Sequence, residues 1–507
     1  MSRTKNAVRN AAWGIVYRLV TLIGPFVVRT LIIHQLGLEY SGLNSLFTSI
    51  LTVLNLANLG FSSSLVFTMY AAVEKKDYVA LRAMLNFFRK VYRVVGVVIL
   101  SIGLLILPFL PNLVSGSYPS SVNLYVIYLY YLIGTALDYF LFAYNNAIFS
   151  AYQRNDITLK VSTFRYLIQY VLQSIVLVIF KNYYLYLILL PIMVIPNNLA
   201  LHFMAKKLYP EVYCEGELDA EVKKGIYNRV STLFGHKLGS TVLVSIDSII
   251  ISAFLNLTVL SLYGNYYYIV TGVNGLVEVV TNGSLAGIGS KLITDSKEES
   301  YAFFQKMTYM WVTLIGSAAT FMLCLFQPFI GGVWLGQKFL LSEPIMIFIV
   351  VYFYAWMFRI MQLTFRDAAG LWTKDWLKPY VGMLVNLIGS VVMVKHTNSV
   401  IGVLIPTIFV MFFIYTPWET WALFKFLFKQ SAREYYMKLF YYTTVSFVGA
   451  GAIYLLCQTV IPENSFQSTV FRFFIVAICY PIIWLLFTYR SSEFKFWYEK
   501  ISRRRKK

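Results

Sequence analysis

The feature that most constrains this chain is a series of long apolar runs separated by short polar connectors. Each run holds about 20 or more mostly apolar residues, the length that an α-helix needs to cross a bilayer. Roughly fourteen such runs occur, and they predict an all-α, polytopic membrane protein. We expect spans at 11–33, 44–71, 93–111, 122–150, 163–180, 184–203, 231–254, 261–290, 307–330, 344–366, 379–395, 399–424, 439–461 and 467–490.

The composition of the 507-residue chain excludes an ordinary soluble protein, because 58% of its residues are hydrophobic and only 13% are charged. The basic start resembles the first part of a signal peptide, but the apolar run behind it is too long and lacks a small-residue cleavage site. We therefore expect a retained first span. The four cysteines lack any metal-binding or CxxC spacing, so the sequence predicts neither a metal site nor another cofactor.

The distribution of Lys and Arg predicts the orientation of the chain. If the N-terminus is cytoplasmic, about 35 of the 43 basic residues lie in or beside cytoplasmic segments, and only about three lie in outer loops. We expect both termini inside and outer loops of at most about 13 residues, too short for a separate active site. The net charge of +20 is accordingly a topology signal, and no nucleic-acid partner is predicted.

The segment 491–507 combines aromatic residues with a basic cluster directly after the last predicted span. This composition is typical of an interfacial segment that lies on anionic lipid. A plain positive-inside anchor has the same composition, and both interpretations remain open at this stage.

The two halves of the sequence resemble each other at an offset near 220 residues. Arg9 corresponds to Arg229, Arg18 falls near Lys237, and "SGLNSLF" (41–47) echoes "LYGNYYY" (262–268). The first and seventh spans also run in the same direction, so we predict a parallel duplication with a substrate site between two pseudo-symmetric halves. The expected domains are an N-lobe of six helices (1–210), a C-lobe of six helices (211–430), two further helices (431–490) and a basic cytoplasmic tail (491–507).

The first span, "AAWGIVYRLVTLIGPFVVRTLII" (11–33), contains Arg18 and Arg29. Each central arginine is disfavoured by about 2.5 to 3.5 kcal/mol on insertion scales, so such charges usually face a protein interior or a wet cavity. The two lie about 20° from the same face and roughly 16 Å apart. Because a guanidinium can donate two hydrogen bonds to phosphate oxygens, Arg18 and Arg29 are both candidate contacts of the lipid headgroup. The alternatives are snorkelling of Arg29 to the outer interface with His34, and of Arg18 to the inner one.

Gly24 and Pro25 lie between these arginines and are a candidate hinge, because the proline removes the helical partner of the carbonyl of residue 21. Lys237 and Arg359 are further candidate phosphate contacts. Polar side chains that line a cavity or bind a coupling ion are expected at Asp138, Asp247, Glu278, Asn55 and Asn274. For each of them, a hydrogen bond to a neighbouring helix is the structural alternative.

Asp138 belongs to a stripe in which Tyr131, Asp138 and Asn145 recur every seven residues. It is a candidate carrier of a proton or Na⁺, a countercharge for an arginine, or a purely structural hydrogen-bonding group. The remaining charged groups near span ends are expected at the membrane interface, namely Arg366, Asp367, Glu419 and the outer anchor Arg472.

A basic N-terminus leads into the Gly-Pro helix, and "GLEYSGLNSLFTSILTVLNLANLGF" (37–61) runs into the second span. With two six-helix lobes and two extra helices, the chain resembles the polysaccharide flippases of the MOP superfamily, which includes Wzx-type flippases, lipid II flippases and multidrug efflux antiporters. The resemblance covers nearly the whole chain. It implies transfer of an undecaprenyl-diphosphate-linked oligosaccharide across the bacterial cytoplasmic membrane by alternating access, driven by an ion gradient or the membrane potential.

The leading hypothesis is therefore a flippase for capsule, exopolysaccharide or a related glycan, and not an enzyme. Its expected partners are the undecaprenyl-diphosphate-linked glycan, anionic lipid, a coupling H⁺ or Na⁺, and glycan polymerase machinery. A cation-coupled multidrug exporter of the same superfamily is the first alternative, although the first span lacks the aspartate known in one efflux branch. A membrane polysaccharide polymerase is the second, and the short outer loops disfavour it.

Overall fold

The structure is a computed structural model that describes residues 3–55 and 61–504, apart from a few side chains within these ranges. The regular elements of the described ranges are all helical. Contacts divide the chain into two compact units, Met1–Ser261 and Leu262–Lys507. The all-helical prediction is confirmed, and the chain is a multi-pass membrane protein.

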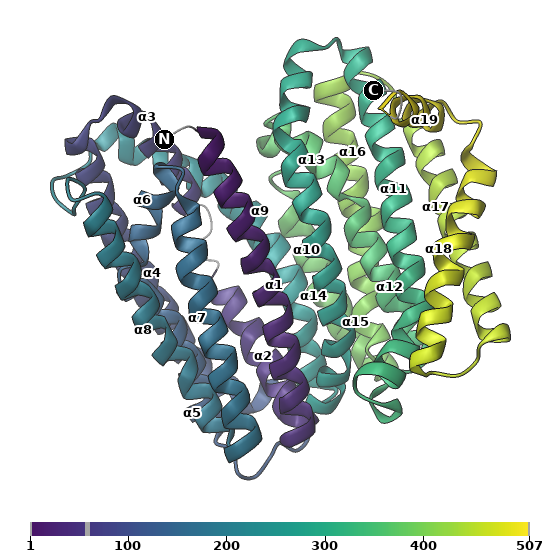
Figure 1. Cartoon of the computed structure of the whole chain (residues 1–507), viewed down its shortest axis with the longest axis horizontal. Coiled ribbons are helices and arrows are strands. Elements are labelled where there is room, and N and C mark those ends of the chain that lie inside the picture. Colours follow the sequence, from purple (N-terminus) through teal and green to yellow (C-terminus); the bar gives the residue numbers. More distant parts are fainter. Residues whose placement is uncertain (1–2, 56–60, 505–507) are drawn as a thin grey trace. The chain divides into compact units, whose positions relative to one another are not determined.

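In the described residues, the α-helices of the first unit run from α1 to the start of α10 (Figure 1). They are α1 (Arg3–Gln35), α2 (Leu38–Leu54), α3 (Phe61–Lys75), α4 (Tyr78–Ile106), α5 (Leu124–Phe140), α6 (Asn146–Ala151), α7 (Asn155–Ile175), α8 (Tyr183–Leu208), α9 (Ala220–Phe254) and α10 (Leu257–Thr294).

Close helix packing organises the first unit. Figure 1 shows α1 and α7 side by side, and these two helices pack along much of their length. At Gly24 the approach is so close that an added Cβ would overlap the ring of Tyr170 on α7. The predicted hinge residues therefore lie in a tight interface, and α1 is helical from Arg3 to Gln35 across Pro25. Further pairs are α5 with α8, α4 with α5, and α2 with α9.

Polar side chains fix where several helices begin. Asp77 accepts a hydrogen bond from the amide of Ala80 at the start of α4, and Asn182 accepts one from Leu185 at the start of α8. These caps satisfy amides that a first helical turn leaves without partners.

The second unit centres on α11 (Lys297–Pro328), which packs against α12, α17 and α18. A capping box of Ser296 and Glu299 starts α11. The other helices are α12 (Glu343–Phe358), α13 (Ile360–Ala368), α14 (Lys378–Thr397), α15 (Ile401–Phe409), α16 (Thr416–Ala422), α17 (Arg433–Val460), α18 (Phe466–Thr488) and α19 (Ser492–Arg504).

The expected anchor Arg472 has a different environment, because its side chain is buried in the second unit. Its guanidinium donates to the carbonyl of Ile461 at the end of α17 (2.6 Å) and to that of Cys324 on α11 (3.3 Å). Carbonyls at a helix end have no partner inside the helix and need such donors. Arg472 thus fastens α18 to its neighbours and is not an outer-interface anchor.

The basic tail forms α19, which docks on the second unit. Glu493 is buried and accepts a hydrogen bond from Lys438 on α17 (2.7 Å), while the indole of Trp497 donates to the carbonyl of Lys306 on α11 (3.0 Å). Burial alone raises the pKa of the Glu493 carboxyl, but Lys438 outweighs this and holds it below its usual value. The segment is therefore an ordered helix attached to the protein.

Within the described residues, each predicted span overlaps one or more helices. Among the described residues, eleven helices are long and apolar enough to cross a membrane, or twelve if the bent pair of α5 and α6 is one span. The predicted spans 44–71 and 261–290 contain residues or side chains beyond the described part, so the number fourteen stays a prediction. The lobe boundary at 210 and the duplication also stay predictions; α9 packs on α2, and the contact boundary lies after Ser261.

Candidate functional site

Arg29 is buried within the first unit, where it joins three helices. Its guanidinium donates to the hydroxyl of Ser45 on α2 (3.2 Å) and to the carbonyl of Ser261 on α10 (2.9 Å). Its side chain therefore does not snorkel to the outer interface, whereas His34 is exposed. A guanidinium keeps its charge even when it is buried in an apolar span, so Arg29 places a cation inside the first unit.

The span predicted as one helix at 122–150 is broken. Helix α5 ends at Phe140, and the next helical segment begins at Ala143 with a bend of 53°. The break frees backbone groups inside an apolar span, which proteins tolerate where other groups or a cavity satisfy them. Neither Gly nor Pro lies at the break, so the sequence carries no local signal for it.

Helix α8 holds both sides of this break through two side chains one turn apart. Asn198 donates from Nδ2 to the Asp138 carboxylate before the break (2.7 Å). His202 pairs through Nδ1 with Asn145 after the break (3.3 Å) and stacks on Phe142 within it. Asp138 and Asn145 of the predicted stripe thus both contact α8, a partner helix that was not predicted.

Two tyrosines of α5 extend this set of polar contacts toward α2. Tyr131 donates to Asn44 Oδ1 (2.5 Å), and Tyr139 donates to Asn55 Oδ1 (3.2 Å). Asn55 therefore lies within one hydrogen bond of the residue that follows Asp138. We call the residues Asn55, Asp138, Tyr139, Asn145, Asn198 and His202 the polar seam.

The chemistry of the polar seam suits a proton or a small cation. Asp138 is exposed, so its carboxylate is accessible, while Asn198 is 1% exposed. The Oδ1 atom of Asn198 is shielded and accepts no hydrogen bond from the residues that the structure describes. A carboxylate next to a buried amide oxygen without a donor offers the hard oxygen ligands that H⁺ or Na⁺ requires.

The remaining cations and acids of the predicted site have varied surroundings. Arg18 is half-exposed on α1, and Lys237 is exposed on α9. Asp247, ten residues further along α9, is 1% exposed. In the second unit, Asn274 is half-buried on α10 with a shielded Oδ1 that accepts no hydrogen bond from the described residues. The side chain of Glu278 lies outside the described part of the chain.

Arg359 belongs to a buried ion cluster in the second unit. Its guanidinium makes two contacts with the carboxylate of Glu419, one of them at 3.2 Å. Lys378 also donates to Glu419 (2.7 Å), and the Glu419 side chain is fully buried. A phosphate would therefore reach Arg359 only by displacing Glu419. Glu419 was expected at the membrane interface, but its two cationic partners stabilise it inside the protein.

Three more charges complete this cluster. Asp375 accepts from Lys378 (2.7 Å) and from Arg366 (2.8 Å), and Arg366 also contacts Asp367 (2.7 Å). Burial favours the neutral carboxyl at Asp375, but Lys378 and Arg366 hold its pKa below the usual value. Three cations thus match three carboxylates. The ion cluster comprises Arg359, Arg366, Asp367, Asp375, Lys378 and Glu419.

No protein-family model matches the sequence, and no curated protein is detectably similar to it. Among solved structures, the lipid II flippase MurJ in an inward closed conformation matches with a TM-score of 0.67 at 15% identity, covering 95% of this chain and 98% of that one. The chain has the fold of MOP superfamily transporters.

Two multidrug resistance MATE family transporters of the MOP superfamily support the same fold. The inward-facing structure matches with a TM-score of 0.63 at 12% identity, covering 79% of this chain and 93% of that one. The outward-facing structure matches with a TM-score of 0.56 at 14% identity, covering 85% and 98%. The fold expected from the resemblance is confirmed.

Proposed function

We propose that this chain is a flippase for undecaprenyl-diphosphate-linked oligosaccharides in the bacterial cytoplasmic membrane, where it serves capsule or exopolysaccharide synthesis. The observation that carries the proposal is the buried Arg29, a permanent cation inside an apolar helix that contacts Ser45 and the carbonyl of Ser261. Such a charge is costly unless an anion or polar cavity compensates it, and a diphosphate headgroup is an anion that must cross this depth.

Coverage of the fold favours a lipid-linked substrate over a drug. The lipid II flippase covers 95% of the chain, whereas the inward-facing multidrug transporter covers 79%. In the proposed mechanism, Arg18 and Arg29 bind the diphosphate at successive depths, and Lys237 provides a third contact. The gradient of H⁺ or Na⁺ acts at Asp138 in the polar seam, and Asp247, Asn274 and Glu278 are further proposed cavity residues.

Transport in proteoliposomes tests this proposal directly. A fluorescent undecaprenyl-diphosphate-linked oligosaccharide is incorporated on both faces, and its transfer is measured by quenching from outside. We expect Arg18→Ala to abolish transfer and Arg18→Lys to retain part of it. Lysine keeps the positive charge but cannot donate two parallel hydrogen bonds to a phosphate. The matched control is Lys207→Ala, an exposed cation at the end of α8.

Two outcomes would contradict the proposal. Transfer by Arg18→Gln at the wild-type rate, with normal insertion, would show that the charge is an anchor. Failure of the wild-type protein to move the lipid-linked sugar, combined with cation-dependent efflux of a dye, would establish the multidrug exporter instead.

A further inference from the structure

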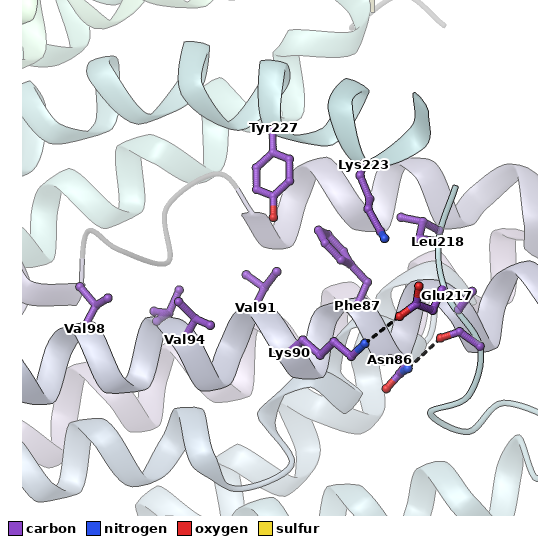
Figure 2. Close-up of a pocket in the computed structure, with 13 residues that line it drawn as sticks. Asn86, Phe87, Lys90, Val91, Val94, Val98, Glu217, Leu218, Lys223 and Tyr227 are labelled. Carbon is purple, nitrogen blue, oxygen red and sulfur yellow. Dashed lines mark hydrogen bonds and ion pairs between the residues drawn. The ribbon is translucent and has the colours of Figure 1, made fainter. Parts of the chain in front are cut away.

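A groove of about 510 Å³ opens beside α4 in the first unit, away from the residues assigned to transport. Four valines of α4 line it at helical spacing of three and four residues, so they share one face. Val91 and Val95 are buried and form its floor, whereas Val94 is 62% and Val98 40% exposed. Figure 2 shows Val91, Val94 and Val98 in a row along the helix.

One end of the groove is polar and mainly basic. Lys90 and Lys223 line it there, together with Glu217. Lys90 and Glu217 form an ion pair at 3.5 Å, but both side chains are largely exposed (60% and 78%). An exposed pair of this kind is worth little, so a stronger anion can replace the carboxylate without a large loss. Asn86 fixes the adjacent loop by donating to the carbonyl of Gly216 (2.8 Å).

The opposite wall comes from the first turns of α9. Tyr227 lies there with its ring edge-on to Phe87 of α4 at 6.0 Å. Figure 2 shows Tyr227 and Lys223 projecting toward α4, across the groove from Lys90. The groove is therefore an amphipathic slot with an apolar trough along α4 and cations at its mouth.

This arrangement occurs where α4 enters the apolar region of the chain. The predicted span of α4 begins at residue 93, so Lys90 precedes the hydrocarbon region and Val94 and Val98 lie within it. Lysines at that level attract anionic headgroups, while apolar side chains below them face lipid chains. The groove therefore suits an amphiphile, because its cations lie at the level of the headgroups and its apolar side chains lie at the level of the acyl chains.

We propose that this groove binds one anionic phospholipid, with an acyl chain along Val94 and Val98 and the phosphate between Lys90 and Lys223. The bound lipid joins α4 to α9, two helices that are far apart in sequence. The site is distinct from the phosphate contacts proposed for transport, since none of its residues belongs to that set.

Photo-crosslinking in nanodiscs tests this site. The probes are phosphatidylglycerol and phosphatidylcholine, each with a diazirine in one acyl chain, and the labelled peptides are mapped by mass spectrometry. We expect phosphatidylglycerol to label residues 83–98 and 216–227 preferentially. Lys90→Gln and Lys223→Gln should each reduce this labelling about fivefold, whereas Lys206→Gln, outside the groove, should not.

Two further variants separate binding from misfolding. Glu217→Gln removes the carboxylate that competes for Lys90, so labelling by phosphatidylglycerol should increase, which damage to the fold would not produce. Val94→Trp should fill the trough and abolish labelling, while Val97→Trp, exposed on α4 but outside the groove, should leave it unchanged.

The proposal fails if both lipids label the groove equally, if its peptides are not labelled, or if neither lysine variant reduces labelling. A decrease with Glu217→Gln would equally overturn it, because the carboxylate would then contribute to the site.

Discussion

Neutralising one carboxylate should destabilise the second unit more than any surface change. Glu419→Gln keeps the size and one acceptor oxygen but removes the charge that Arg359 and Lys378 share. Glu419 is completely buried and contacts both cations at hydrogen-bond distance. After the change, three buried cations face only two carboxylates, Asp367 and Asp375.

The size of the effect follows from this excess charge. Removing one partner of a buried ion pair costs about 3 to 5 kcal/mol. For a cooperative unit of some 250 residues, this lowers the apparent melting temperature by roughly 5 to 20 °C. Arg359→Met with Glu419→Leu removes one charge of each sign, and Lys378 keeps Asp375. This double variant should therefore lose less stability than Glu419→Gln alone.

Thermal unfolding in detergent, followed by thiol or tryptophan fluorescence, provides the measurement. The matched control is Glu434→Gln, because Glu434 is half-exposed in its pair with Lys438 and should contribute at most about 1 kcal/mol. If Glu419→Gln melts within a degree or two of Glu434→Gln, or if the double variant is the least stable of the three, the reasoning from buried charge is refuted.

Three other predictions concern topology, the tail helix and coupling. In a cysteine-free background, Ser117→Cys and Ser342→Cys should react with an impermeant reagent from outside and Lys206→Cys should not; the reverse pattern would invert the orientation. Because the pKa of Glu493 is lowered, its contribution is present above the ordinary value of about 4.3 and is lost as pH falls through the lowered pKa. The hydrogen-exchange protection factors of α19, which correct for the slower intrinsic exchange in acid, should therefore decrease as pH falls, and Glu493→Gln should decrease them at pH 7. Asp138→Asn should abolish the dependence of transport on the ion gradient, and unchanged dependence would remove this residue from coupling.

The native Cys214 is a poor topology reporter even though its loop is expected to be cytoplasmic. Burial raises the pKa of its thiol, with Arg89 opposing this only in part. Since the thiolate is the reactive species, Cys214 should react slowly from either face. An introduced, exposed cysteine therefore gives the clearer result.

The helices could be predicted because apolar length is a local property of the sequence. The capping residues Asp77 and Asn182 also act within one helical turn. The break after Phe140 could not be predicted, since its cause is long-range: Asn198 is 60 residues from Asp138 in sequence, and no Gly or Pro marks the bend. Hydropathy accordingly treats 122–150 as one run.

The environments of the charged residues could not be predicted for the same reason, because their partners are distant in sequence. Hydropathy evaluates each charge alone and places Glu419 at an interface, whereas Arg359, 60 residues away, neutralises it inside the protein. Arg472 likewise resembles an anchor until the free carbonyl at the end of α17 is known. The sequence predicts that Arg29 lies inside the first span, but its contact with Ser261 depends on a tertiary approach that periodicity does not encode.

The two bonds from α8 to the broken span have a mechanical consequence. Because Asn198 and His202 lie one turn apart on a continuous helix, α8 connects the helical segments on the two sides of the bend. The angle between α5 and α6 can change only if one of these bonds breaks or if α8 shifts with it. Protonating Asp138 would remove the charge from its hydrogen bond with Asn198, so the attachment before the break would weaken while the contact of His202 with Asn145 after it would remain.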